Sequence, residues 1–129
     1  MNFYNRRRGM KFGSKRVEAD GHSFASKLES AVYTVLKARE NAKEIKILQV
    51  QDHVYLTRAR ICYIPDFKCL DISSGKEFHV EAKGFQTPEW SIKKRLWKCY
   101  GPGNLEIWRG NHMRPFLDEV ITPERGDDD

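Results

Sequence analysis

The strongest constraint on the fold is the order in which hydrophobic periodicity changes along the chain. Apolar residues recur at helical spacing over residues 26–41, and a second helical segment follows Thr87. Between these segments lie runs rich in β-formers, and one more run follows the second helix. These runs cover residues 45–51, 53–56, 60–64, 67–72, 77–83 and 105–108. The order helix, strands, helix, strand predicts an α/β fold with helices packed on one mixed sheet.

Both expected helices begin at recognisable capping residues. Ser26 with Glu29 three positions later is a capping-box pattern, and Thr87 followed by Pro88 suits a second N-cap and first helical position. The run Gly101-Pro102-Gly103 should end the second helix. Prolines 115 and 123 argue against one long helix near the C-terminus, and 105–108 is expected to be the last strand.

Charge and length divide the chain into three parts. The 129 residues suit one domain, expected over 13–121, between a flexible basic arm (1–12) and an acidic tail (122–129). The formal net charge of +5 is compatible with a nucleic-acid partner. No apolar run approaches the roughly 20 residues of a membrane span, and the basic N-terminus lacks a signal peptide's apolar stretch. We therefore expect no membrane partner and a cytoplasmic location.

Three side chains carry candidate chemistry, two in the predicted hairpin 67–83 and one immediately before it. Glu81 and Lys83 lie two residues apart in a strand and so share one face, together with His79. Asp66 begins the neighbouring strand and can reach them. Carboxylate oxygens bind hard cations such as Mg²⁺, and an adjacent lysine can position water or stabilise charge on a phosphoryl group. A surface hairpin with an ordinary Glu–Lys pair is the alternative, and a catalytic histidine is not needed for this chemistry.

Pro65-Asp66 with Glu81-x-Lys83 resembles the PD-(D/E)XK nuclease superfamily, which includes restriction endonucleases and Holliday junction resolvases. The chain looks most like small, mostly phage-encoded members, through Lys15–Gly21, Phe24-x-Ser26-Lys27-x-Glu29, Gln51 and Thr87. The pieces around Asp66 and Glu81 also look like phage junction resolvases of the endonuclease I type. The resemblance covers roughly residues 10 to 110.

The resemblance implies a restriction-endonuclease-like αβββαβ core and a requirement for Mg²⁺, with Mn²⁺ as a substitute. It implies Asp66 and Glu81 as metal ligands and Lys83 as the catalytic lysine. The family's acidic residue on the first helix falls on Glu29, which either reaches the metal or serves only the capping box. Gln51 matches a family position and either touches substrate or makes a buried hydrogen bond.

By analogy, the expected function is structure-selective cleavage of branched DNA, with a homodimer supplying two active sites and no small-molecule cofactor. Phosphate contacts are expected from basic side chains on the arm and the second helix, with Gln51 beside the site. They are Arg6, Arg7, Arg8, Lys11, Lys15, Arg16, Lys93 and Lys94. Nicking or non-specific cleavage of duplex DNA, and a non-catalytic DNA-binding protein on a nuclease fold, remain alternatives. Trp97 and Trp108 are expected in the core, whereas Trp90 lies nearer the candidate site.

Overall fold

The computed structural model describes residues 16–84 and 86–124. The expected basic arm (1–12) and most of the acidic tail lie outside the described residues. So do five of the expected phosphate contacts, namely Arg6, Arg7, Arg8, Lys11 and Lys15. Within the described part of the chain no helix is long and apolar enough to cross a membrane.

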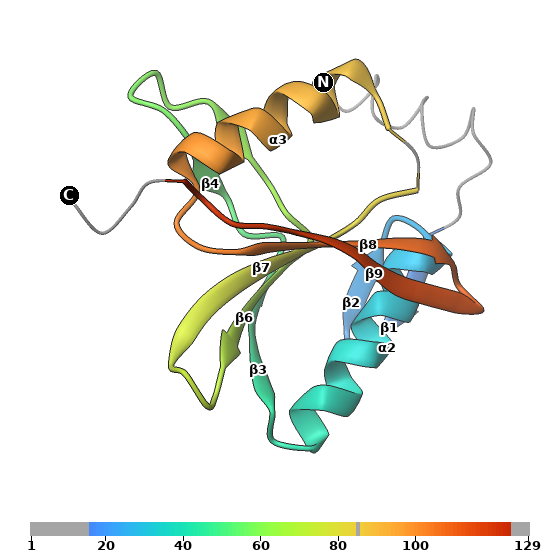
Figure 1. The fold of residues 1–129 in the computed structure, drawn as a ribbon. Helices are drawn as coiled ribbons and strands as arrows, with labels where there is room; N and C mark the ends of the chain where they lie inside the picture. Colours follow the sequence, from blue (N-terminus) through green and yellow to red (C-terminus); the bar gives the residue numbers. More distant parts are fainter. Residues whose placement is uncertain (1–15, 85, 125–129) are drawn as a thin grey trace.

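A mixed five-stranded sheet forms the centre of the fold (Figure 1). Its strands stand in the order β3 (Ile45–Val50), β6 (Phe67–Asp71), β7 (Lys76–Ala82), β8 (Leu105–Asn111) and β9 (Arg114–Ile121). Only β7 and β8 pair in parallel, as their connection through a helix requires. The other neighbouring pairs are antiparallel. The sequence prediction of an α/β fold with a mixed sheet is confirmed.

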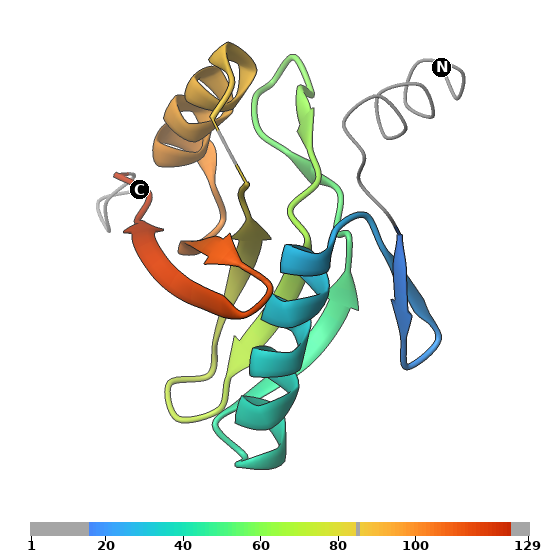
Figure 2. The same cartoon turned by 90° about the vertical axis from the view of Figure 1, so that its right-hand side faces the viewer.

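The two helices of the described residues, α2 (Lys27–Asn41) and α3 (Pro88–Tyr100), lie on opposite faces of this sheet (Figures 1 and 2). On the α2 side, Val32 and Leu36 pack against Phe67 and Val80. On the α3 side a separate cluster contains Trp90, Trp97, Leu105 and Ile107 with residues of a small hairpin. The predicted caps are confirmed, because Ser26 Oγ accepts from the Glu29 amide at 3.1 Å and Thr87 Oγ1 accepts from the Trp90 amide at 3.1 Å.

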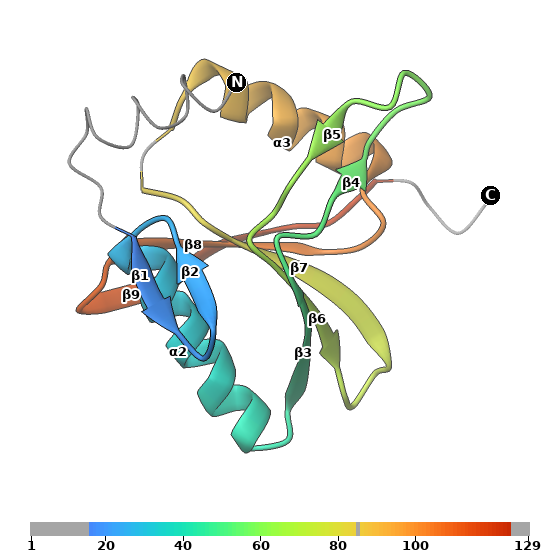
Figure 3. The same ribbon diagram turned by 180° about the vertical axis from the view of Figure 1, so that it is seen from behind.

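Two short hairpins complete the described fold. β1 (Val17–Ala19) and β2 (His22–Phe24) flank a turn at Asp20-Gly21 and lie beside α2. β4 (Val54–Tyr55) and β5 (Cys62–Tyr63) follow β3 and precede β6 along the chain. They form a separate ribbon on the α3 side of the sheet (Figure 3). The sequence predicts the second ribbon as two β runs but does not predict β1 and β2, because each has only three residues.

The expectation that 105–108 is the last strand is wrong. That strand continues to Asn111, and β9 follows it as an edge of the sheet. Pro115 hides β9 in the sequence because proline interrupts most strands, although an edge position tolerates it. A register shift between Ile107 and Trp108 further breaks the regular alternation of the hairpin.

Candidate active site

Asp66 and Glu81 meet where β6 and β7 lie side by side. Phe67 pairs with Val80, so one further step along the same register sets Asp66 opposite Glu81. The Asp66 side chain is fixed there, because its Oδ2 accepts a hydrogen bond from the Ala82 amide at 2.8 Å. The Asp66 carbonyl also accepts from the Gln51 amide at 2.8 Å. The backbone of three strands therefore positions this carboxylate.

Glu29 reaches the same place from the other side of the sheet. It lies in the first turn of α2, and its side chain is only 5% exposed. The Ser26 cap holds its backbone amide, which fixes the start of the helix and the direction of the Glu29 side chain. Charge on Glu29 raises the pKa of both Asp66 and Glu81, so Glu29 interacts electrostatically with each of them.

All three carboxyl groups hold their protons more tightly than usual, and burial is the largest cause in each. Burial and the charges of Glu81 and Glu29 raise the pKa of Asp66 well above its ordinary value. Burial also raises the pKa of Glu81 to about 7, even though Lys83 opposes the shift. The pKa of Glu29 is raised by burial and lowered in part by a backbone hydrogen bond from Ala25. Crowded buried carboxylates of this kind are typical of functional sites.

Two carboxylate oxygens in this cluster are buried without a hydrogen-bond partner, Glu29 Oε2 and Glu81 Oε1. Buried oxygens of this kind call for an ion or a water as partner. Within the two described ranges, however, no three His, Cys, Asp or Glu side chains already enclose a metal-sized position. Mg²⁺ requires no such cage, since it keeps several waters and binds through one or two carboxylates plus substrate phosphates. The donor set therefore fits a divalent cation.

Lys83 stands beside this cluster at the end of β7. Its Nζ lies 3.6 Å from Glu81 Oε2 and 4.6 Å from the centroid of the Trp90 ring. A hollow of about 320 Å³ adjoins it, lined in part by Tyr63, Trp90 and Lys93. The sequence predicts Lys83 at the site but not the aromatic support. Trp90 is 2% exposed, so it packs beneath the lysine instead of offering a free face for a base.

Tyr63 is a site neighbour that the sequence analysis does not identify. Its hydroxyl is buried without a partner at ordinary hydrogen-bonding geometry, yet Glu81 and Tyr63 lie close enough to shift each other's pKa. Burial first, and the charge of Glu81 second, raise the pKa of this phenol, so it stays protonated. Tyr63 therefore keeps its O–H, a neutral hydrogen-bond donor beside Glu81.

His79 shares the face of Glu81, as its spacing predicts, but it is committed to a structural contact. The ring is 3% exposed, packs edge-on against Trp97 and places Nε2 2.9 Å from Asp52 Oδ2. Burial lowers the pKa of His79, and the Asp52 carboxylate partly offsets that shift. The pair ties the chain after β3 to β7.

The expected DNA contacts within the described residues differ in exposure and in whether they already bind another group of the protein. Arg16 and Gln51 are exposed, although Arg16 Nε donates to Ser23 Oγ at 2.8 Å. Lys93 Nζ donates to the Cys62 carbonyl at 2.6 Å, and Lys94 Nζ lies 2.8 Å from Glu119. The two lysines therefore already serve to fasten α3 to β5 and β9.

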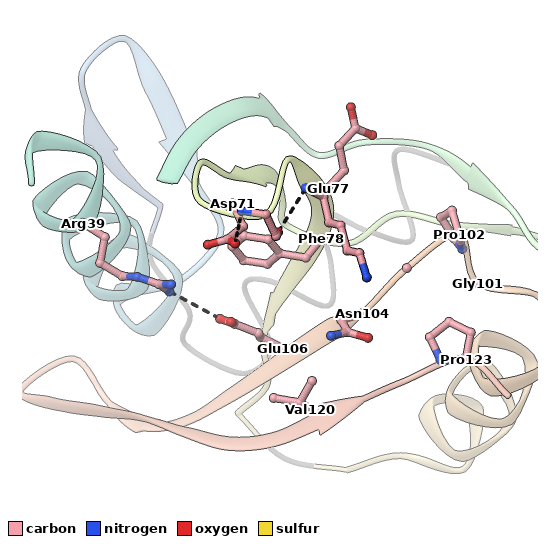
Figure 4. A pocket seen from close by; sticks show the side chains of 13 residues that line it. Arg39, Asp71, Glu77, Phe78, Gly101, Pro102, Asn104, Glu106, Val120 and Pro123 are labelled. Carbon is pink, nitrogen blue, oxygen red and sulfur yellow. Dashed lines mark hydrogen bonds and ion pairs between the residues drawn. The ribbon is translucent and has the colours of Figure 1, made fainter. Parts of the chain in front are cut away.

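A larger hollow of about 760 Å³ lies at the opposite end of β7 (Figure 4). Its lining includes Arg39, Glu77 and Glu106, and Arg39 Nη1 pairs with Glu106 Oε1 at 3.7 Å. Three acidic and two basic side chains line it, namely Asp71, Glu77, Glu106, Arg39 and Lys76. This hollow is separate from the cluster of Glu29, Asp66 and Glu81.

Comparison with known proteins gives one match. The family described as "Protein of unknown function (DUF1064)" matches residues 9–108, which include every described side chain of the candidate site. No curated protein and no solved structure matches the chain.

Proposed function

We propose that this chain, which belongs to the DUF1064 family, is a metal-dependent DNA endonuclease. The observation that carries the proposal is the meeting of Glu29, Asp66 and Glu81 beside Lys83, with two carboxylate oxygens buried and unpartnered. Burying three carboxylates together is unfavourable unless a cation joins them, and a structural role alone does not require it. The element order α2, β3, β6, β7, α3, β8 also agrees with the αβββαβ core of restriction-endonuclease-like nucleases.

In this proposal Asp66 and Glu81 hold Mg²⁺ or Mn²⁺, and Glu29 contributes the third carboxylate. The bound ion would neutralise the scissile phosphate and lower the pKa of a water that acts as nucleophile. The Ala82 amide donates to Asp66 Oδ2 and so fixes the orientation of the carboxylate. The other oxygen, Oδ1, would then be the one that coordinates the ion.

Lys83 supplies a positive charge from the protein, in addition to the metal ion, for the phosphate of the substrate. Its ammonium group can donate hydrogen bonds to phosphoryl oxygens as their negative charge grows during attack. Glu81 on one side and the Trp90 ring on the other restrict its motion. A lysine held in place before substrate binds loses less conformational entropy in the reaction.

We propose branched DNA as the preferred substrate and a homodimer as the active form. The support is the resemblance to junction resolvases and the excess of positive charge, since symmetrical cleavage of a four-way junction needs two active sites. Non-specific or nicking cleavage of duplex DNA is the rival activity.

The deciding experiment compares cleavage of a labelled four-way junction with cleavage of a linear duplex of the same sequence. Wild type and Glu81→Ala are assayed in Mg²⁺, in Mn²⁺ and in EDTA. Junction cleavage that needs metal and disappears in the variant supports the proposal. Equal cleavage of both substrates removes the preference for branches and favours the rival activity. DNA binding without cleavage in either metal refutes the nuclease and leaves a DNA-binding protein.

A further inference from the structure

The ribbon of β4 and β5 projects from the α3 side of the sheet (Figures 1 and 3). It pairs with no other strand of the described residues, and residues 56–61 connect its two strands. In the loop, the Thr57 carbonyl accepts from the Arg60 amide at 2.8 Å and Thr57 Oγ1 accepts from the Ala59 amide at 3.0 Å. These bonds give the projecting tip a defined shape.

The ribbon carries positive charge with nothing to balance it locally. No aspartate or glutamate occurs from His53 through Ile64, whereas Arg58 and Arg60 stand exposed in the loop. Neither arginine pairs with an acidic side chain among residues 16–84 and 86–124. By contrast, Arg109 is held by Asp118 at 2.9 Å on the edge of the sheet. Two exposed, unpaired guanidinium groups on a protruding element suit the phosphates of nucleic acid.

Arg60 is also held in an orderly arrangement. Its guanidinium lies 4.3 Å from the centroid of the Tyr55 ring, and Tyr55 itself is 49% exposed. Stacking on an aromatic ring restrains the planar group while its N–H edges stay free to meet a phosphate. Arg60 has a φ of 58°, a left-handed backbone conformation within the loop, where its amide donates to the Thr57 carbonyl.

The base of the ribbon is fastened to the candidate active site. Asp52, just before β4, bonds to His79 on β7, and Lys93 of α3 bonds to the Cys62 carbonyl on β5. Tyr63 adjoins Glu81, and Asp66 follows β5 after only two intervening residues. The ribbon is therefore anchored at its base beside the carboxylates, and Arg58 and Arg60 lie in the loop at its other end.

We propose that the β4–β5 ribbon is a DNA-binding element that grips the phosphate backbone of a duplex beside the cleavage site, through Arg58 and Arg60. The inference rests on the proposed function for its choice of DNA as the partner. It adds contacts that the sequence motifs do not include. Because the ribbon grows from the segment that bears Asp66, it sets which phosphate comes to the carboxylates.

The test is the salt dependence of DNA binding by the full chain, measured in EDTA so that nothing is cleaved. Fluorescent linear duplex and four-way junction DNA are titrated with wild type and with Arg58→Ala/Arg60→Ala. Each lost phosphate contact lowers the slope of log affinity against log salt by about 0.9, so we expect a decrease of about 1.8. With equal affinities at about 1 M salt, this amounts to roughly 60-fold weaker binding near 0.1 M.

Lys43→Ala/Lys46→Ala is the matched control. It removes the same charge from exposed lysines after the far end of α2, well away from Glu29 in its first turn. We expect it to bind like wild type. Arg58→Lys/Arg60→Lys keeps both charges and should keep most of the slope, which also guards against misfolding of the alanine variant.

An unchanged slope in Arg58→Ala/Arg60→Ala overturns the inference. An equal decrease in slope for the Lys43→Ala/Lys46→Ala control also overturns it. Duplex RNA of the same sequence is titrated in parallel, and a slope change seen only with the RNA overturns the choice of DNA. Failure of the proposed function looks different. If the ribbon variant loses binding but wild type never cleaves in Mg²⁺ or Mn²⁺, the ribbon is supported and the nuclease is not. If wild type cleaves DNA and the ribbon variant cleaves it with the same apparent affinity, the nuclease is supported and the ribbon is not.

Discussion

Replacing Glu81 by glutamine should stabilise the metal-free protein at neutral pH. Burial raises the pKa of Glu81 from 4.5 to about 7. A folded-state pKa above the unfolded one means that the native state binds the proton more tightly. The free energy of unfolding is then highest below the unfolded pKa and falls as pH rises through the folded one. The difference between these two pKa values corresponds to roughly 3 kcal/mol, and the Glu81 side chain is only 11% exposed.

The assay is urea unfolding in EDTA from acidic to mildly alkaline pH. Glutamine cannot ionise, so the advantage of Glu81→Gln over wild type should grow between pH 4.5 and about 7 and then level off. Removing the Glu81 charge also relieves Asp66, because that charge raises the pKa of Asp66. Glu77→Gln is the control on the same strand. Its side chain is 54% exposed, so its effect should stay within about 0.5 kcal/mol.

Adding Mg²⁺ should reverse the order of stability. A ligand at about 1,000 times its Kd stabilises the protein that binds it by about 4.1 kcal/mol, which exceeds the roughly 3 kcal/mol advantage of the metal-free Glu81→Gln variant. Wild type gains this stabilisation, and Glu81→Gln loses it because the amide no longer supplies a charged ligand. A Glu81→Gln variant that is destabilised equally at every pH and responds to Mg²⁺ like wild type would refute the reasoning.

Three further outcomes test separate parts of the structure. Lys83→Met should slow single-turnover DNA cleavage by about 10²–10³-fold and leave the Mg²⁺-dependent rise in Tm intact, and loss of that rise would contradict the assigned role. Asp52→Asn should lower the pKa of His79 in an NMR titration and the free energy of unfolding by about 1–3 kcal/mol, since the pair is buried, and an unmoved titration would contradict the pairing. Gly110→Ala should lower Tm, because Gly110 has a φ of 100° and an added Cβ would meet the Arg114 carbonyl oxygen, whereas Gly84→Ala meets nothing within 4 Å and should leave Tm nearly unchanged.

The sequence predicts the parts of this fold whose cause is local. Ser26 and Thr87 act as caps through hydrogen bonds to amides three residues onward, so a short window of sequence contains the whole signal. Alternation in residues 77–83 likewise indicates which side chains share a face. β9 is different, because its place at the edge depends on pairing with β8 and its proline is tolerable only there.

The candidate site divides in the same way. Spacing in one strand relates Glu81 to Lys83, and the hairpin register brings in Asp66. Asp52 and Tyr63, in contrast, reach the site through contacts between segments far apart in sequence, with His79 and with Glu81. No periodicity records such contacts. Trp90 has a local place on α3, but its role under Lys83 depends on how α3 packs across the sheet.

Each carboxylate of the cluster has partners that favour its charged form, and these partners are not sufficient. The Ala82 amide serves Asp66, Lys83 serves Glu81, and a backbone bond at Ala25 serves Glu29, yet burial still dominates every shift in pKa. The two hydrophobic clusters on opposite faces of the sheet must therefore offset an unfavourable charge arrangement at its end. Neutralising any one carboxylate should then raise metal-free stability and weaken ion binding together. A variant that gained stability and still responded fully to Mg²⁺ would show that these properties have different origins.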